Sequence, residues 1–148
     1  MHAIVFSGIQ GCGKTTFYRE RFFDTHVRLS LDLFKTRSRE NILLHACVAA
    51  QQPFVVDNTN TASKVRRRYA QLAAAAGFRT TLYFFDCPAA LALRRNAQRL
   101  GKSRVPDLAI RGALAKLEPP SHEEGFDQIC RVVVREDGLV VEPWGDLR

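Results

Sequence analysis

Eight residues near the start of the chain have the types and spacing of a phosphate-binding loop. Gly8-Ile9-Gln10-Gly11-Cys12-Gly13-Lys14-Thr15 read G-x-x-x-x-G-K-T. Glycines let the backbone curl so that several N–H groups point at one phosphate. Lys14 can then reach the terminal phosphates, and the Thr15 hydroxyl can bind Mg²⁺. The sequence therefore predicts an ATP and Mg²⁺ site formed by Gly8, Gly11, Cys12, Gly13, Lys14, Thr15 and Thr16.

The segments on either side of the loop favour this interpretation over a chance glycine turn. Ala3–Ser7 is a short apolar run typical of a strand, and Lys14–Phe23 can form a helix. A strand, a tight turn and a helix start place the positive end of the helix dipole at the phosphate.

Two carboxylates follow predicted strands and could act on the nucleotide or on an acceptor. Asp32 comes just after Val27–Leu31, and Asp57 ends Pro53–Asp57. Functional residues of open α/β sheets lie at the carboxyl ends of strands. Asp32 could be a general base toward an acceptor hydroxyl, and Asp57 could serve the metal shell or the acceptor pocket. Both positions equally suit helix caps or turns.

Cationic residues gather in two helical segments. Arg95 and Arg99 are four residues apart and share one helix face. They suit a lid that closes over phosphates, although spacing alone favours a solvated face. The run Lys64, Arg66, Arg67 and Arg68 could guide a nucleic-acid backbone, but we expect it to be the wet face of an alanine-rich helix.

Cys12 lies inside the loop, near Lys14 and a helix start. A thiol in such a place can be unusually acidic and prone to oxidation. The alternative is a small residue tolerated where the backbone makes the contacts.

Strand and helix patterns alternate, which predicts an α/β protein with a mainly parallel sheet. Further strands are expected at Thr80–Asp86 and Ile129–Arg135, with a short hairpin strand at Leu139–Glu142. Further helices are expected near Arg39–Gln51, Ala62–Ala76, Pro88–Leu100 and Asp107–Lys116. For the first three of these helices we also expect a buried apolar stripe. The stripes are Ile42, Leu43, Ala46 and Ala49 in the first helix; Ala62, Val65, Tyr69, Leu72 and Ala76 in the second; and Leu93, Ala97 and Leu100 in the third.

Composition limits the class of protein. A chain of 148 residues fits one domain, and a net charge of +7 suits a polyanionic ligand such as ATP or nucleic acid. The four cysteines form no C-x-x-C pair and the four histidines form no ligand pattern. No apolar run reaches membrane-spanning length, and the early loop argues against a removable signal peptide, so we expect a cytoplasmic protein without a membrane partner.

Taken together, the motifs resemble the kinase domain of polynucleotide 5′-hydroxyl kinases of the bacteriophage type and the animal kinase-phosphatase type. The resemblance covers roughly residues 3 to 135. It rests on motifs in the family's order: GIQGCGKTTF from Gly8 to Phe17, Leu29-Ser30-Leu31-Asp32, Val56-Asp57-Asn58-Thr59-Asn60, Arg68-Tyr69, Arg95-Asn96 with Arg99, Val105-Pro106, Glu118-Pro119-Pro120 and Glu124-Gly125-Phe126.

The resemblance implies transfer of the ATP γ-phosphate to a 5′-hydroxyl end of DNA or RNA. It implies Lys14, Asp32 as general base and Arg99 as catalytic residues, with Arg95 and Arg99 on a lid at about 95–106. It also implies a single P-loop kinase domain over residues 1–148, with five parallel strands in the order 2-3-1-4-5, helices on both faces and a small lid. At this length we expect no phosphatase or ligase module beside the kinase domain.

The acceptor side departs from the family pattern. Lys35 stands where the phage enzymes have an acceptor-binding arginine, and Arg37 could substitute; Asp57 would support the same side. Gln10 stands where the family usually has proline. Two alternatives stay open, namely a kinase of a nucleoside or other small alcohol, and a non-kinase ATPase or nucleotide switch. The sequence indicates no oligomeric state.

Overall fold

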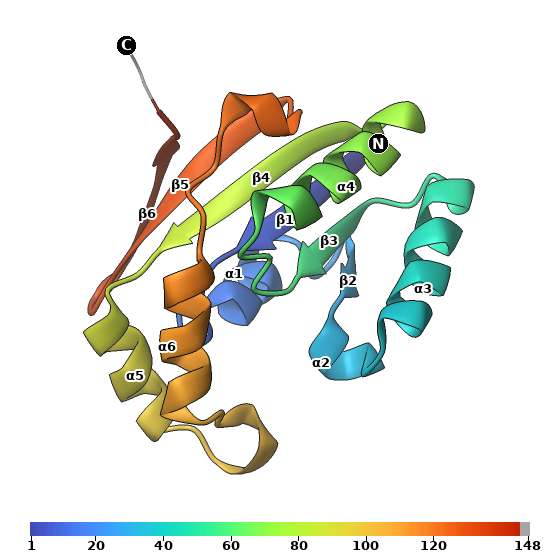
Figure 1. Ribbon diagram of the computed structural model, residues 1–148. Helices are drawn as coiled ribbons and strands as arrows, with labels where there is room; N and C mark the ends of the chain where they lie inside the picture. Colours follow the sequence, from blue (N-terminus) through green and yellow to red (C-terminus); the bar gives the residue numbers. More distant parts are fainter. Residues whose placement is uncertain (146–148) are drawn as a thin grey trace.

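The computed structural model describes residues 1–145, which form a six-stranded sheet with helices on both faces (Figure 1). The strand order is β2-β3-β1-β4-β5-β6. The first five strands run parallel and β6 pairs with β5 in the antiparallel direction. The predicted order of the five parallel strands and the hairpin strand are both confirmed. The strands are β1 His2–Ser7, β2 Val27–Leu29, β3 Phe54–Asp57, β4 Arg79–Asp86, β5 Gln128–Arg135 and β6 Gly138–Pro143.

The centre of the sheet fixes where the functional loops meet. β1 lies between β3 and β4, with Ala3 opposite both Phe54 and Thr80. Every residue of β3 and nearly every residue of β1 is buried, as expected for parallel strands covered on both faces. The carboxyl ends of β1 and β3 therefore lie side by side, and the loops that follow them start from neighbouring points.

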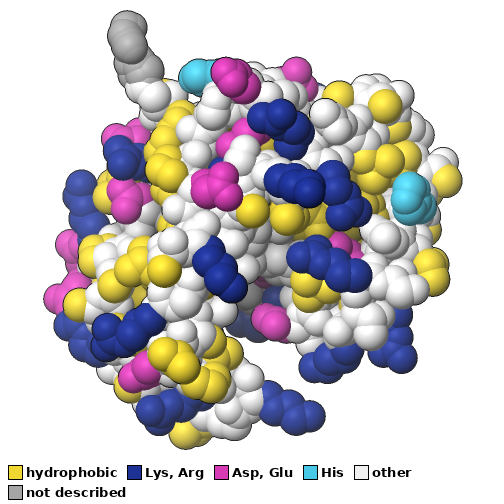
Figure 2. Space-filling view, in the orientation of Figure 1, with side chains coloured by type: hydrophobic (Ala, Val, Ile, Leu, Met, Phe, Trp, Pro, Cys, Tyr) yellow, Lys and Arg dark blue, Asp and Glu magenta, His cyan; other side chains and the backbone are white. Residues whose placement is uncertain are grey.

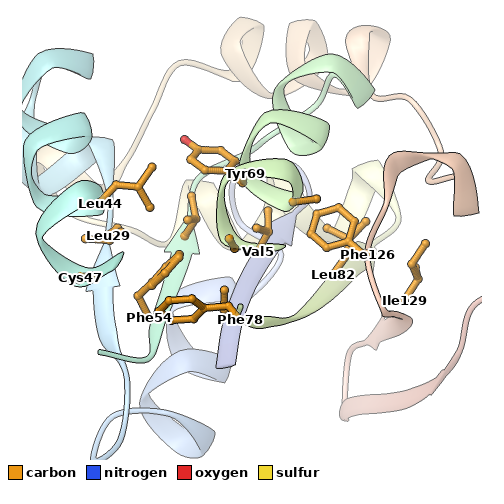
Figure 3. Close-up of a cluster of buried hydrophobic side chains, with 14 residues drawn as sticks. Val5, Leu29, Leu44, Cys47, Phe54, Tyr69, Phe78, Leu82, Phe126 and Ile129 are labelled. Carbon is orange, nitrogen blue, oxygen red and sulfur yellow. The ribbon is translucent and has the colours of Figure 1, made fainter. Parts of the chain in front are cut away.

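The helices divide between the two faces of the sheet. α3 (Arg37–Ala50) and α4 (Ser63–Ala75) pack on one face, over the cluster shown in Figure 3. α1 (Lys14–Arg21), α5 (Ala89–Ala97) and α6 (Asp107–Lys116) pack on the other face, around Phe6 and Phe85. Short helical segments complete the chain: α2 (Leu31–Phe34), η1 (Gly101–Ser103) and η2 (His122–Glu124).

An aromatic group fixes α1 against the sheet. The ring of Phe17 on α1 lies 5.7 Å from that of Phe6 and 5.4 Å from that of Phe85. The Phe17–Phe85 pair is edge-on, and pairs of that geometry stabilise packing by about 0.5–1.5 kcal/mol beyond the area they bury. The phosphate-binding loop therefore joins two elements that are held firmly together.

The predicted buried stripes were partly wrong. On α3 the buried residues are Glu40, Leu44 and Cys47, while Ile42 is 66% and Leu43 40% exposed. None of the four predicted residues is buried, because α3 turns a different face to the sheet, on which Asn58 of the β3–α4 turn and Tyr69 of α4 hold Glu40.

The stripes of α4 and α5 were also only partly right. α4 buries Tyr69 as predicted, but its other buried residues are Arg66, Ala70 and Ala73. α5 buries Leu91, Ala92 and Asn96 and ends at Ala97, so Leu100 lies beyond the helix and is 88% exposed. Among residues 1–145, the structure contains no helix with both the length and the apolar character needed to span a bilayer.

Candidate active site

Close backbone contacts explain the glycines of the loop after β1. A Cβ atom at Gly8 would lie 2.8 Å from the Cβ of Phe85, and one at Gly11 would lie 2.7 Å from the carbonyl oxygen of Ala92. Gly11 also has a φ of +83°, which a side chain disfavours. The loop therefore packs closely between β4 and α5.

The loop leads directly into the N-terminus of α1. Gly13 precedes the helix in a left-handed conformation with φ 89° and offers no side chain to cap it. The first N–H groups of a helix have no partners within the helix. Together with the helix dipole, they form a site for an anion in front of Lys14 and Thr15.

Lys14 spans the loop from inside. Its Nζ donates to the carbonyl oxygens of Gly8 and Ile9, both at 2.9 Å, and the residue is 9% exposed. A desolvated ammonium group attracts a phosphate more strongly than one in water does.

A hydroxyl and a carboxylate meet at the ends of α1 and β3. Thr15 Oγ1 donates to Asp57 Oδ2 at 3.0 Å, and Arg28 Nε donates to the same oxygen at 2.8 Å. Hydroxyl and carboxylate oxygens fit Mg²⁺, which proteins commonly hold with only one or two side chains plus substrate phosphates. Residues 1–145 contain no cluster of three or more His, Cys, Asp or Glu that could hold a metal.

Sequence reasoning missed Arg28. It lies in the middle of the three-residue strand β2, and its side chain reaches Asp57, Thr15 and Ser30. A charged residue within a strand beside a functional loop was the available signal, but no motif includes it.

Asp32 lies in the first turn of α2 and is exposed. Ser30 occupies the N-cap position of this helix, so Asp32 is not its cap. The backbone N–H of Leu31 donates to Asn58 Oδ1 at 2.8 Å. This bond ties the helix that carries Asp32 to the residue following Asp57. Among the described residues, the Asp32 carboxylate has no hydrogen bond or ion pair, so its oxygens are open to solvent.

A polar cluster supports this connection from the side of α3. Asn58 Nδ2 donates to Glu40 Oε2 at 2.7 Å, and Tyr69 donates through its hydroxyl to Glu40 Oε1 at 2.6 Å. Burial and the neighbouring Glu40 carboxylate raise the pKa of Tyr69 above the usual range of a phenol, which keeps this donor protonated. Arg37 contacts both Glu40 and Tyr69, while Lys35 is exposed just after α2.

The two arginines that the sequence predicts for a lid lie differently. Arg95 Nη1 is 3.7 Å from the position that a Cβ of Gly13 would take, so this side chain lies beside the phosphate-binding loop. Arg99 Nη1 instead donates to the carbonyl oxygen of Ser103 at 3.2 Å, along the segment after α5. Asn96, buried between them, exchanges two hydrogen bonds with the backbone of Val105 and ties the two ends of that segment together.

A family model described as "AAA domain" matches residues 4–120. The chain belongs to this family. Among solved structures, the domain is similar to a gluconokinase from Sinorhizobium meliloti, with 18% identity, a TM-score of 0.66 and coverage of 91% of this chain and 83% of that chain. It is also similar to Kti12 from Chaetomium thermophilum in complex with ADP-AlF3, with 16% identity, a TM-score of 0.60 and coverage of 88% of both chains.

A third similar structure comes from the PezAT toxin-antitoxin system of Streptococcus pneumoniae, with 17% identity, a TM-score of 0.66 and coverage of 93% of this chain and 70% of that chain. At these identities the similarity establishes the fold. The chain is an α/β protein with the P-loop kinase fold.

The prediction that the whole basic run of this AAA domain lies on a wet helix face was wrong for Arg66. Lys64, Arg67 and Arg68 are exposed, but Arg66 is fully buried. Its guanidinium forms a bidentate pair with Glu124, with Nε–Oε1 at 2.8 Å and Nη2–Oε2 at 2.9 Å. Sequence reasoning missed this function because the partner lies 58 positions away.

The same arginine holds the base of the phosphate-binding loop. Arg66 Nη1 donates to Ser7 Oγ at 3.2 Å and to the carbonyl oxygens of Asn60 and Thr61 at 3.0 and 3.1 Å. Ser7 ends β1, immediately before Gly8. One buried side chain therefore links the start of the loop, the β3–α4 turn and η2.

The hypothesis of an acidic Cys12 in this AAA domain was also wrong. Its thiol is fully buried and donates to the carbonyl oxygen of Ile9 at 2.8 Å. Burial raises its pKa even though Lys14 is near. Cys12 is thus a small packing residue within the loop.

Proposed function

We propose that the protein is an ATP- and Mg²⁺-dependent phosphotransferase that moves the γ-phosphate to a 5′-hydroxyl end of DNA or RNA. One observation carries the proposal. Asn58 ties the Asp32 helix to the strand end where Asp57 meets Thr15. Neighbouring elements thus carry the phosphate-binding loop, the Thr15 and Asp57 oxygens that could hold a metal, and the exposed carboxylate of Asp32. Residues 1–148 would act as a single kinase domain with a lid at about 95–106.

The nucleotide side follows from the loop. Backbone N–H groups from Gly11 to Thr16 and the Lys14 ammonium would bind the ATP phosphates, with Arg95 beside them. Thr15 and Asp57 would hold Mg²⁺, which supplies charge neutralisation at the phosphates. Arg99 would reach the transferring group if its side chain left the carbonyl oxygen of Ser103, a contact that lies within the proposed lid.

Asp32 is the better candidate for general base of the two carboxylates. Asp57 is 5% exposed and is already held by Arg28 and Thr15. Asp32 is exposed and its lone pairs are available for the proton of an acceptor hydroxyl. Phosphoryl transfer asks little else of the protein beyond positioning and charge neutralisation.

An open pocket lies beside the loop, on the side of α6. It measures about 560 Å³ and is lined by Gln10, Thr59, Thr61, Pro106, Leu108, Ala109, Gly112, Ala113 and Lys116. That volume is of the size of small-ligand sites, but none of Asp32, Lys35 and Arg37 lines the pocket, so the acceptor proposal does not rest on it. Lys and Arg side chains lie on both sides of the hollow between the lid region and the α2–α3 region (Figure 2), which suits a polyanion. Lys35 and Arg37 belong to the α2–α3 side.

A second candidate acceptor is a small polyhydroxylated acid. The fold similarity to a gluconokinase favours it, with a TM-score of 0.66. A kinase of this kind would bind ATP through the same residues, but it would show no salt-dependent binding of oligonucleotides.

The test is transfer of labelled γ-phosphate from ATP to 5′-hydroxyl DNA, 5′-hydroxyl RNA, matched 5′-phosphate oligonucleotides and a panel of sugar acids and nucleosides. We expect label on the 5′-hydroxyl oligonucleotides only. Asp32→Asn should lower kcat by about 10²–10⁴-fold with ADP affinity unchanged. Asp137→Asn, in the exposed β5–β6 turn, is the matched control. Label on a small alcohol alone would overturn the nucleic-acid acceptor, and full turnover by Asp32→Asn would overturn the kinase mechanism.

A further inference from the structure

Arg28 is a partly buried cation at the oxygen pair assigned to the metal, and the proposed reaction gives it no role. Its side chain is 26% exposed and that of its ion-pair partner Asp57 is 2% exposed. It comes from β2, whereas Asp57 ends β3 and Thr15 belongs to α1. Tertiary packing alone brings the three together.

The guanidinium takes up hydrogen-bonding capacity on both oxygens of the pair. Asp57 Oδ2 accepts from Arg28 Nε at 2.8 Å and from Thr15 Oγ1 at 3.0 Å. Arg28 Nη2 also donates to Thr15 Oγ1 at 3.3 Å. A hydroxyl oxygen has two lone pairs, and Arg28 occupies one of them on Thr15, so the guanidinium stands close to any metal bound at this oxygen.

We propose that Arg28 and Mg²⁺ compete for the Thr15–Asp57 pair, so that loading of Mg²⁺ with the nucleotide requires the guanidinium to leave Asp57 Oδ2. The proposal rests on the assignment of this pair as the metal site in the proposed function. Arginine and a divalent cation on one carboxylate oxygen repel each other strongly where solvent screening is weak. Arg28 therefore sets how much Mg²⁺ the protein needs.

The same contact explains how Asp57 is accommodated without a metal. A buried carboxylate is costly unless a partner neutralises it. Arg28 supplies that partner, and the neighbouring Ser30 Oγ, 3.4 Å from Nη2, offers the guanidinium a contact on the side of β2. Arg28 thus exchanges with the metal and does not act as a fixed brace.

The experiment measures ADP binding by calorimetry over a series of Mg²⁺ concentrations, with EDTA as the zero point. Arg28→Met keeps the aliphatic stem and removes the charge. We expect the Mg²⁺ concentration at half-maximal ADP affinity to fall about fivefold, the scale of one partly screened ion pair. Arg79→Met, an exposed strand arginine at the far end of β4, is the control and should leave the Mg²⁺ dependence unchanged.

An unchanged or increased Mg²⁺ requirement in Arg28→Met would overturn the proposal and make Arg28 a structural brace. Arg28→Lys retains the charge without the fork of donors and provides the answer if the methionine variant does not fold. Arg28→Lys should also lower the Mg²⁺ requirement, by less than fivefold. A raised Mg²⁺ requirement in this variant would equally overturn the proposal that Arg28 and Mg²⁺ compete. Asp57→Asn separates the two proposals: if it keeps the full Mg²⁺ dependence of the parent protein, the assigned metal site fails, whatever Arg28 does.

Discussion

Breaking the buried pair between Arg66 and Glu124 should be among the most damaging single changes outside the nucleotide site. Both side chains are 0% exposed and share two hydrogen bonds of 2.8 and 2.9 Å. Glu124→Gln keeps the size of the side chain but removes its charge and turns one acceptor into a donor. Leaving one member of a buried ion pair without its partner costs about 3–5 kcal/mol.

The structure predicts how that cost appears in experiments. For a chain of this length, 1 kcal/mol corresponds to a shift of about 2–4 °C in Tm, so Glu124→Gln should lower Tm by about 10 °C. Because Arg66 also holds Ser7 and the β3–α4 turn, ADP affinity should fall as well. Arg66→Met combined with Glu124→Leu removes both charges, and we expect it to recover part of the lost stability, because Ser7, Asn60 and Thr61 still lose the donor that Arg66 provides.

Urea unfolding followed by circular dichroism, with ADP titration of each variant, tests the reasoning. The double-mutant cycle should give a coupling energy of about 2 kcal/mol or more between the two sites. Glu123→Gln, the exposed neighbour in η2, is the matched control and should change stability by less than about 0.5 kcal/mol. Additive effects at the two sites, or a loss below about 1 kcal/mol in Glu124→Gln, would refute the argument that this pair holds the loop.

Three further outcomes are expected. Gly11→Ala places a Cβ 2.7 Å from the Ala92 carbonyl oxygen at a φ of +83° and should weaken ADP binding by about tenfold or more in calorimetry; retained affinity would show that the loop can move. Burial raises the pKa of the Cys12 thiol, so at about pH 8 this residue should react with iodoacetamide only as fast as the protein unfolds. Rapid labelling, assigned to Cys12 by peptide mapping, would contradict its burial. Burial lowers the pKa of His2 and His26 below 6.5, so the stability that these side chains contribute is present above pH 6.5 and is lost as the pH falls through their native pKa values. A variant with both histidines replaced by asparagine should therefore lose less stability between about pH 7 and 5.5, and an unchanged dependence of stability on pH would show that the two histidines do not cause it.

Features carried by local sequence were predictable. The loop from Gly8 to Thr15 is a contiguous motif whose turn, donors and helix start follow from adjacent residues. The order of the parallel strands was expected from the resemblance to a kinase fold, and it is confirmed. Asp57 was singled out because it ends a strand, and the structure places it against Thr15.

Features that depend on polar burial were not predictable. Arg66 looked like part of a solvated run, and Glu40 sits where an apolar stripe would exclude it, yet both are buried. Periodicity assigns charged residues to the surface, because burying a charge without a partner is costly. The partners that remove this cost, Glu124 for Arg66 and Tyr69 with Asn58 for Glu40, belong to other elements.

The sequence by itself therefore determined that the chain has a phosphate-binding loop and the strand and helix pattern to support it. These depend on backbone conformation and on neighbours within a few positions. Only the tertiary structure decided what surrounds that loop: Arg28 against the Thr15–Asp57 pair, Arg66 beneath Ser7, and Asn58 at the helix of Asp32. Each of these contacts joins separate elements, and hydrogen bonds between buried groups depend on distance and direction in space, which spacing along a chain does not encode.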